Sequence, residues 1–208
     1  LTSDDSLEMY LLGYDQFGNY IRRVDGLWNV EGGIGYVSNP EDMVNNIIFY
    51  AGSVGSGYVT ADTTNFHAET GLVTILAGEY STVSIRTGPD GGGYELGDTL
   101  ITADDVLNLF AASYDTDGNF VHNPVVSWSV TGDLGTFSVD IGSSSTFSAN
   151  LSGSGFIQAD TSGILSEISL WIVPGTMNYL MIQDNLGNEI NNVTMSTDSS
   201  LSLSVFAF

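Results

Sequence analysis

The chain has 208 residues, enough for one large domain or two ordinary ones, and its 42% hydrophobic and 11% aromatic content can build buried cores. Lys and Arg together number 3 against 25 Asp and Glu, and the net charge of -22 repels polyanions such as nucleic acid and acidic membrane surfaces. We therefore expect no nucleic-acid partner and no membrane insertion. The absence of cysteine excludes disulfides and thiolate metal sites.

The chain repeats itself. Residues 1–35 align without a gap on residues 101–135, and residues 56–62 match residues 154–160. The identical pairs include Asp4 and Asp104, Asp15 and Asp115, Gly18 and Gly118, Asn19 and Asn119, Trp28 and Trp128, and Gly78 and Gly175. The tail, residues 196–208, follows residues 102–114 in the same way. One domain has therefore been copied along the chain.

These matches divide the chain into three units. Residues 1–78 are expected to form a domain that lacks its first strand, because the segment 81–87 has no counterpart in the first copy. Residues 79–175 form a complete domain, and residues 176–208 contain the first strands of a third repeat. Since both ends cut through a repeat, we expect the chain to be a segment of a longer array.

The complete copy contains seven short apolar runs bounded by turn residues, and none of them has a helical period. The predicted strands are residues 81–87, 105–113, 124–131, 136–140, 145–151, 155–160 and 167–173. Seven short strands with one tryptophan in the third indicate an all-β fold of tandem Ig-like sandwiches with Greek-key connections, arranged head to tail. Trp28 and Trp128 are predicted to fill equivalent core positions.

Both copies carry the order D-x-x-G-N, then W-x-V-x-G-x-x-G, then G-S-G-x-x-x-A-D, then a strand that closes at glycine. This order resembles the bacterial Ig-like repeats of invasin-type and related surface proteins, along the whole chain. The resemblance implies an Ig-like fold and an extracellular array, and it implies no ligand. The chain departs from the commoner pattern in having Tyr20 and Phe120, where invasin-type repeats often have proline.

The stretch YDTDGNF, residues 114–120, has the alternating acids of a calcium loop. Only part of that pattern recurs in the first copy, where Phe17 replaces Asp117, and Val126 stands where a calcium loop of the EF-hand kind needs an acid. Both copies keep an Asp whose side chain can accept a hydrogen bond from a backbone N–H, and a Gly-Asn pair that tolerates positive φ. The pattern predicts a hairpin turn.

Calcium remains an alternative at the junction between the first two units. In a seven-strand sandwich, the turn at 115–119 faces the preceding domain, so six carboxylates are expected to approach one another there. They belong to Asp4, Asp5, Glu79, Asp115, Asp117 and Asp160. Such a cluster would need a hard cation such as calcium to offset its repulsion, with stiffening of the array as the result. The other interpretation is that these acids are solvated and spread apart.

Catalytic chemistry is weakly indicated. His67 and His122 are the only histidines and do not recur, no Gly-x-Ser-x-Gly elbow occurs, and the glycine-rich residues 88–93 read as a flexible loop. A carboxylate pair for glycoside hydrolysis stays open among 25 acids, although acids repeated in each copy are typical of turns and linkers.

Three aromatic side chains are predicted to point outward. Alternation in the second strand leaves Phe110, matched by Tyr10, on the solvent side, and alternation in the last strand leaves Trp171 outside. They could make a lateral contact to another chain, stack on a sugar, or lie over their own sheet.

The sequence thus favours a non-enzymatic, extracellular or cell-surface array that serves as a stiff spacer and assembly module of a fibre or adhesin, with neighbouring repeats or identical chains as partners. A carbohydrate-binding accessory module of a secreted protein, with glycans as partners, is the alternative. An acidic hydrolase is a third hypothesis.

Overall fold

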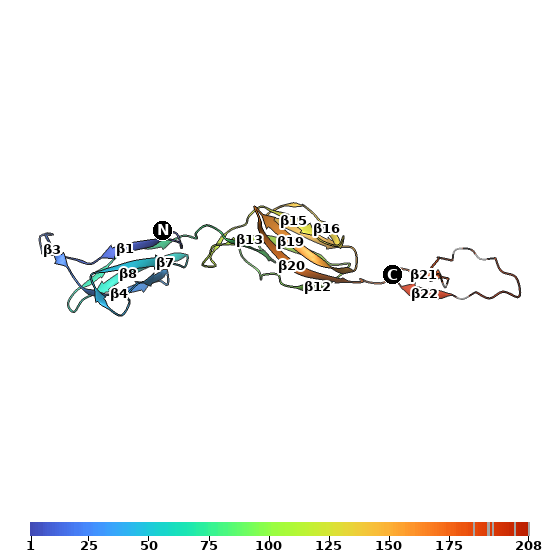
Figure 1. The fold of residues 1–208 in the computed structure, drawn as a ribbon, viewed down its shortest axis with the longest axis horizontal. Helices are drawn as coiled ribbons and strands as arrows, with labels where there is room; N and C mark the ends of the chain where they lie inside the picture. The colour runs from blue at the N-terminus through green and yellow to red at the C-terminus, as the bar shows by residue number, and fades with distance from the viewer. Residues whose placement is uncertain (185, 191, 193, 202, 208) are drawn as a thin grey trace.

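The computed structural model describes residues 1–184, 186–190, 192, 194–201 and 203–207. Two β-sandwiches lie end to end along the long axis, and residues 176–207 continue beyond the second sandwich (Figure 1). The N-terminus lies beside the junction between the sandwiches. Nowhere in these described ranges is there a helix of the length and apolarity that crossing a bilayer demands.

The first sandwich has one sheet in the order β1-β7-β5 and a second in the order β10-β8-β4-β6, with β9 beside β8; β2 and β3 form a ribbon that extends the first. Its strands are β1 (Ser6–Tyr10), β2 (Leu12–Tyr14), β3 (Tyr20–Arg23), β4 (Gly26–Glu31), β5 (Gly35–Val37), β6 (Met43–Val44), β7 (Asn46–Ala51), β8 (Gly55–Asp62), β9 (His67–Glu69) and β10 (Val73–Ile75).

The second sandwich has sheets in the orders β11-β13-β18-β16 and β12-β20-β19-β15-β17, with β14 beside β13. Its strands are β11 (Thr82–Arg86), β12 (Thr99–Thr102), β13 (Val106–Tyr114), β14 (Phe120–His122), β15 (Val126–Val130), β16 (Gly135–Phe137), β17 (Ile141–Gly142), β18 (Ser144–Ala149), β19 (Gly153–Thr161) and β20 (Ile164–Val173).

The all-β, Ig-like prediction is confirmed, and each of the seven predicted strands is present within a few residues of its expected bounds. The short strands β12, β14 and β17 were missed, because runs of two to four residues give too little alternation to detect. The missed strand β12 pairs in parallel with β20, so it places residues 99–102 on the sheet opposite β11.

Each sandwich has its own core. Trp28 is 5% exposed and Trp128 is 3% exposed, which confirms their predicted packing, and they belong to two separate clusters of buried residues. Both indole N–H groups donate to a backbone carbonyl, that of Val44 at 2.9 Å and that of Gly142 at 3.0 Å. The buried tryptophans thereby satisfy their one polar atom in the same way in both units.

The two sandwiches differ at one edge. In the second, β13 lies between β11 and β18, whereas in the first the corresponding strand β1 is the edge strand of its sheet. The strand that β11 supplies to the second sandwich therefore has no counterpart among the described strands of the first. Strand β11 pairs with residues 110–114, and the equivalent edge of the first sandwich, at residues 10–14, has no such partner among the described strands.

The last strands, β21 (Leu180–Gln183) and β22 (Ser204–Ala207), form an antiparallel pair. Ile182 lies opposite Val205, as Ile85 lies opposite Ala111 between β11 and β13. Since residues 78–86 align with 175–183 and residues 102–114 with 196–208, the pair has the register of the first two strands of the complete sandwich.

Candidate functional site at the junction of the two sandwiches

The turn between β13 and β14 lies at the end of the second sandwich that faces the first. Asp115 Oδ1 accepts hydrogen bonds from the backbone N–H of Asp117 at 3.0 Å and of Asn119 at 2.8 Å. Gly118 has φ +82, the left-handed conformation that favours glycine. The sequence interpretation of YDTDGNF as a tight turn is confirmed.

The same turn occurs three times. Asp15 and Asp184 each accept from the backbone two and four residues onward, and Gly18 and Gly187 have φ of +82 and +86. Among the described residues, the turn at 115–119 is the one that contacts another sandwich, so its additional contacts show what the turn can bind.

Asp115 Oδ2 is the centre of the junction. It accepts from Ser3 Oγ at 2.6 Å, from the backbone N–H of Gly78 at 3.0 Å and from Asn119 Nδ2 at 2.9 Å. The side chain is 3% exposed. Burial by itself raises the pKa of Asp115, but the hydrogen bonds from Ser3, Asn119 and Gly78 outweigh burial and hold the pKa well below its usual range.

The amide of Asn119 joins the turn to a loop of the first sandwich. Asn119 Nδ2 donates to the carbonyl of Gly52 at 2.9 Å, and Asn119 Oδ1 accepts from the backbone N–H of Val54 at 3.2 Å. The turn therefore hydrogen-bonds to the first sandwich at two places: Asp115 bonds to the linker at Gly78, and Asn119 bonds to the loop at 52–54. Two separated attachments resist both bending and rotation.

Asp4, from the first sandwich, also hydrogen-bonds to the linker and to the turn of the second sandwich. Asp4 Oδ2 accepts from the backbone N–H of Glu79 at 3.3 Å, and Asp4 Oδ1 accepts from Thr116 Oγ1 at 3.2 Å. A Cβ on Gly78 would collide with this carboxylate. The pattern recurs at the far end of the second sandwich, where Asp104 accepts from the N–H of Thr176 at 2.7 Å and a Cβ on Gly175 would collide with Asp104.

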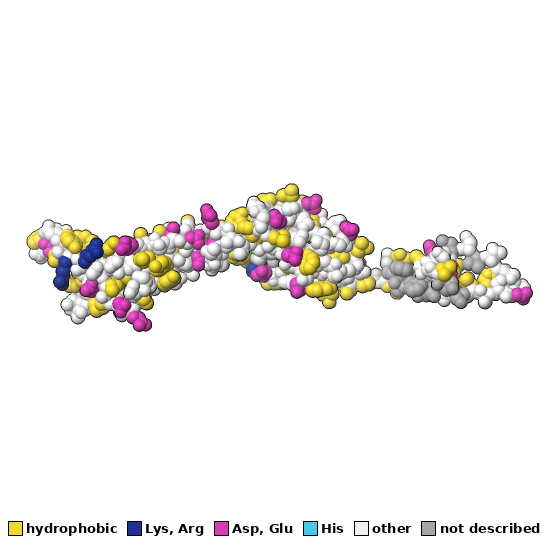
Figure 2. Space-filling model, in the orientation of Figure 1, with side chains coloured by type: hydrophobic (Ala, Val, Ile, Leu, Met, Phe, Trp, Pro, Cys, Tyr) yellow, Lys and Arg dark blue, Asp and Glu magenta, His cyan; other side chains and the backbone are white. Residues whose placement is uncertain are grey.

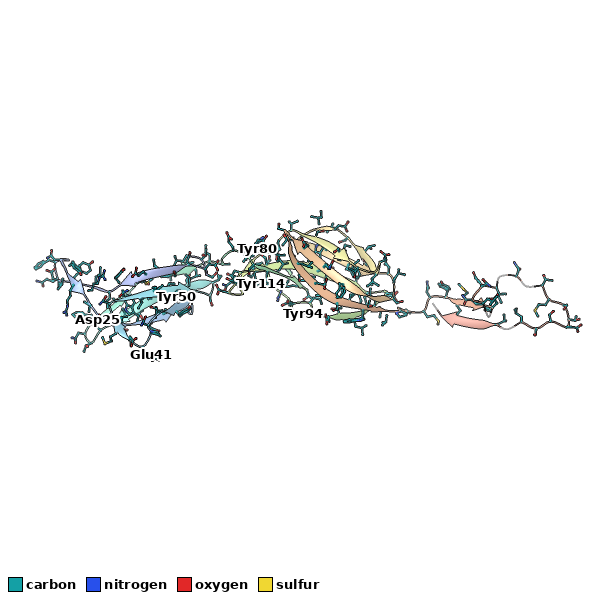
Figure 3. The ribbon with its side chains drawn as sticks, viewed as in Figure 1. Asp25, Glu41, Tyr50, Tyr80, Tyr94 and Tyr114 are labelled. Atoms are coloured by element: carbon teal, nitrogen blue, oxygen red, sulfur yellow. The ribbon has the colours of Figure 1, made fainter. Side chains whose placement is uncertain are left out.

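Aromatic side chains surround the linker on the side of the second sandwich. Tyr80 packs edge to face on His122, with ring centroids 5.3 Å apart, and Tyr114 packs in the same manner on Phe120 at 6.0 Å. Tyr80 and Tyr114 lie where the second sandwich faces the first (Figure 3). The equivalent pair Tyr14 and Tyr20 has the same 6.0 Å separation at the opposite end of the first sandwich.

The structure brings together part of the predicted carboxylate cluster. The carboxylates of Asp4 and Asp115 both accept hydrogen bonds from backbone N–H groups of the linker, and Glu79 contributes its N–H. Asp5 instead accepts from the N–H of Thr2, and Asp160 from the N–H of Gly163. Asp117 contributes its backbone N–H to the turn.

Calcium would need several of these carboxylates around one point. Within the described ranges, no group of three or more His, Cys, Asp or Glu side chains is arranged to hold a metal ion. The described contacts stabilise the ionised carboxylate of Asp115 with hydrogen bonds from N–H and O–H donors. Calcium at the junction stays a prediction of the sequence.

The predicted outward aromatics have different surroundings. Trp171 is 46% exposed and pairs along the strands with Leu100 and Ser154. Tyr10 is exposed beneath the guanidinium of Arg23, whose Cζ lies 4.4 Å from the ring centroid. Phe110 is half-buried opposite Arg86 and Ser144.

The residues that the sequence missed at the junction are Ser3, Gly52, Val54 and the linking role of Asn119. Ser3 is replaced by Ala103 in the second copy, so repetition could not reveal it. The recurring pairs Asp4 with Gly78 and Asp104 with Gly175 carried a usable signal, because a carboxylate and a linker glycine recur together in both copies.

No family model matches the sequence, and no curated protein matches it. Among solved structures, the chain is similar to FdeC, an Escherichia coli adhesin, with 13% identity over 99% of this chain and 69% of that one, and a TM-score of 0.47. It is similar to the D00-D0 domain of intimin, with 13% identity over 81% and 91% and a TM-score of 0.41. It also resembles the S-layer protein rSbsC, with 14% identity and a TM-score of 0.33, covering 94% of this chain and 31% of that one.

Proposed function

We propose that the chain is a non-enzymatic structural segment of an extracellular or cell-surface fibre or adhesin. In this proposal residues 1–78, 79–175 and 176–208 belong to three successive Ig-like units, and each sandwich acts as a stiff spacer. The high negative charge, -22, keeps neighbouring chains soluble and apart along most of their surface.

The observation that carries the proposal is the locked linker. The turn at 115–119 bonds to the linker at Gly78 and to the loop at Gly52 and Val54, so the two sandwiches are held at two separate points. Contacts between domains of one chain ordinarily allow relative motion, but here the buried carboxylate of Asp115 hydrogen-bonds to the first sandwich and to the linker. A fixed contact between successive domains is the property that a stiff spacer requires.

The proposal is tested by small-angle X-ray scattering on the 208-residue chain. We expect the maximum dimension of a straight rod, and a shorter, broader distance distribution for the double variant Asp115→Ala with Asn119→Ala. The matched control is Asp15→Ala with Asn19→Ala, which removes the same turn contacts where no second sandwich packs. A flexible wild-type chain, or equal effects of the two double variants, would overturn the proposal.

A second candidate function is a carbohydrate-binding module. It is favoured by Trp171, which is 46% exposed, and by Phe156, which is 42% exposed on the neighbouring strand. Aromatic faces of this kind stack on sugar rings. Binding on a glycan array that is lost on Trp171→Ala, with the rod shape intact, would favour this candidate over the spacer alone.

A further inference from the structure

The second sandwich carries an apolar strip on the outer face of one sheet. The apolar strip consists of Leu100 on β12, Trp171 on β20 and Phe156 on β19. Leu100 lies opposite Trp171, and Phe156 lies opposite Ser169, which is two residues before Trp171 and has the same outward direction. The exposed fractions are 67% for Leu100, 46% for Trp171 and 42% for Phe156. Large apolar side chains thus cross three neighbouring strands in contact with solvent.

Neither a missing strand nor a following unit accounts for this exposure. The apolar strip belongs to the sandwich in which all seven predicted strands are present. In the first sandwich the residue equivalent to Trp171 is Thr74, and Thr74 stays exposed although the second sandwich is docked at the end of its strand. A following unit that docks in the same way would therefore leave the apolar strip uncovered.

Two exposed carboxylates lie beside the apolar strip. Asp98 Oδ1 accepts a hydrogen bond from the backbone N–H of Ser169 at 3.3 Å, and Ser169 is the residue opposite Phe156. Glu167 lies two residues before Ser169 on β20, so its side chain leaves the sheet on the same face. Both acids are exposed. The face therefore combines apolar side chains with negative charge.

Glu167 is held in place by hydrogen bonds across the sheet. Gln158 Nε2 donates to Glu167 Oε2 at 2.6 Å, and Ser129 Oγ donates to Gln158 Oε1 at 3.2 Å. The three residues lie opposite one another on β20, β19 and β15. Both partners are neutral, so the charge of Glu167 stays uncompensated. A carboxylate that is already oriented loses less side-chain entropy when a cation binds to it.

The face has no positive charge of its own. Strands β12, β15, β17, β19 and β20 contain neither Lys nor Arg. The only Lys or Arg between positions 79 and 175 is Arg86, which lies in the opposite sheet and donates to the carbonyls of Gly92 and Gly93. Acidic side chains are spread over both sandwiches, whereas the basic ones in view gather mainly at the outer end of the first (Figure 2). The charge of this face is complementary to a basic partner.

We propose that this face docks an extended segment of a partner protein that is rich in arginine or lysine. A guanidinium group of the segment stacks on the ring of Trp171, and the carboxylates of Asp98 and Glu167 bind further basic groups. Trp171 and Glu167 are four residues apart on β20, a span of about 13 Å, so basic residues at positions i and i+4 of an extended segment match them. The proposal goes beyond the spacer function, because it names a surface by which the array holds another protein.

Other occupants fit this face less well. A second copy of the chain brings 25 acidic residues against 3 basic ones, so its approach is opposed by charge. Small molecules prefer concave sites, whereas this is the open face of a sheet. A neutral sugar can also stack on Trp171, but it gains no attraction from the net charge of Asp98 and Glu167.

The first test titrates a synthetic peptide of four Arg-Ser repeats into the intact chain. Its arginines have the alternate spacing of one face of a strand. Trp28 and Trp128 are buried, so a change in tryptophan fluorescence on binding reports mainly on Trp171. We expect saturable binding of one peptide per chain at about 50 mM salt, weakened about 10-fold at about 200 mM salt because the attraction is screened. A peptide of four Asp-Ser repeats should not bind.

The stacking contact is tested by Trp171→Ala. We expect this substitution to weaken peptide binding about 10-fold, because the ring that receives the guanidinium group is lost. Tyr94→Ala is the matched control, since Tyr94 is an exposed aromatic residue of the same sandwich outside the apolar strip (Figure 3). Calorimetry measures these affinities, because Trp171→Ala removes the fluorescent reporter.

The charge contact is tested by Glu167→Gln, which keeps the shape of the side chain and removes its charge. We expect about 5-fold weaker peptide binding. Glu41→Gln, at an exposed position of the first sandwich, changes the net charge of the chain by the same amount and should leave the affinity unchanged (Figure 3). An unchanged unfolding midpoint in each variant shows that the sandwiches stay folded.

Absence of saturable binding, or binding that Trp171→Ala leaves unchanged, would overturn the proposal. Equal losses in Glu167→Gln and Glu41→Gln would also overturn it, because they would trace the attraction to the acidic surface as a whole. Binding to a glycan array that Trp171→Ala abolishes and the Arg-Ser peptide does not displace would assign the face to a sugar instead. The rod shape of the chain is measured separately, so the spacer proposal stands or falls on its own.

Discussion

Ser3 Oγ donates a hydrogen bond of 2.6 Å to the buried carboxylate of Asp115, across 112 positions of sequence and from one sandwich to the next. The same carboxylate oxygen accepts from the N–H of the linker residue Gly78, and Ser3 Oγ in turn accepts from that N–H at 2.9 Å. Three groups from two domains thus share one buried point. The angle between the sandwiches depends on this point.

Replacing the carboxylate should loosen the junction. We expect Asp115→Asn to cost about 2 kcal/mol of stability, because an amide places a donor against the N–H of Gly78 and loses charge-assisted bonds. Asp15→Asn is the matched control, since it alters the same turn without a second sandwich against it. Calorimetric unfolding of both variants measures the difference, and equal losses would place the effect in the turn alone.

The junction should weaken in acid. The pKa of Asp115 is held low in the folded chain, so its contribution is fully present above the unfolded pKa of about 3.9 and is lost as pH falls below that value. We expect the stability gap between the wild type and Asp115→Asn to be constant from neutral pH down to about pH 5. Below about pH 4 it should narrow by up to ~1.4 kcal/mol per pH unit. A gap that widens in acid would contradict the hydrogen-bond pattern.

The two linker glycines should resist substitution. A Cβ at Gly78 or Gly175 meets the carboxylate of Asp4 or Asp104, so Gly78→Ala and Gly175→Ala should each cost about 1–3 kcal/mol. Gly97→Ala is the control, because no atom lies within 4 Å of a Cβ there. Thermal unfolding compares the three. A loss at Gly97 as large as at Gly78 would show that backbone freedom, and not the carboxylate, sets the requirement.

Removing divalent cations with a chelator distinguishes the two explanations for the acidic residues at the junction, hydrogen bonding and a bound calcium ion. Because hydrogen bonds from Ser3, Gly78 and Asn119 already stabilise the charged carboxylate of Asp115, we expect a chelator at constant ionic strength to leave the unfolding midpoint unchanged. A bound calcium ion would instead make the midpoint fall on chelation and recover when calcium is returned. A reversible fall in the unfolding midpoint would favour a bound cation and would show that the hydrogen bonds alone do not account for the stability of the junction.

The sequence predicted the sandwich well, because alternation and repetition report burial directly. The tryptophans and the seven strands of the complete copy depend on side chains that face a core, and such positions have a fixed period. The turn at 115–119 was equally accessible, since Asp, Gly and Asn are required by its local backbone conformation.

The junction could be predicted only in part. Repetition marked Asp4, Gly78 and Asp115, but the partners Ser3, Gly52 and Val54 depend on how one domain is set against the next. No periodic pattern encodes that orientation. The carboxylates were expected to repel one another, and the structure instead surrounds one of them with N–H and O–H donors, which composition cannot reveal.

The turn at 15–19 has the hydrogen bonds of the turn at 115–119 to within about 0.1 Å, although no neighbour presses on it. Its shape is therefore inherited from its own five residues and not imposed by docking. Because the turn already has this conformation without a neighbouring domain, it loses little conformational entropy when it packs against one. Successive units of one array can therefore pack against each other without first remodelling this turn.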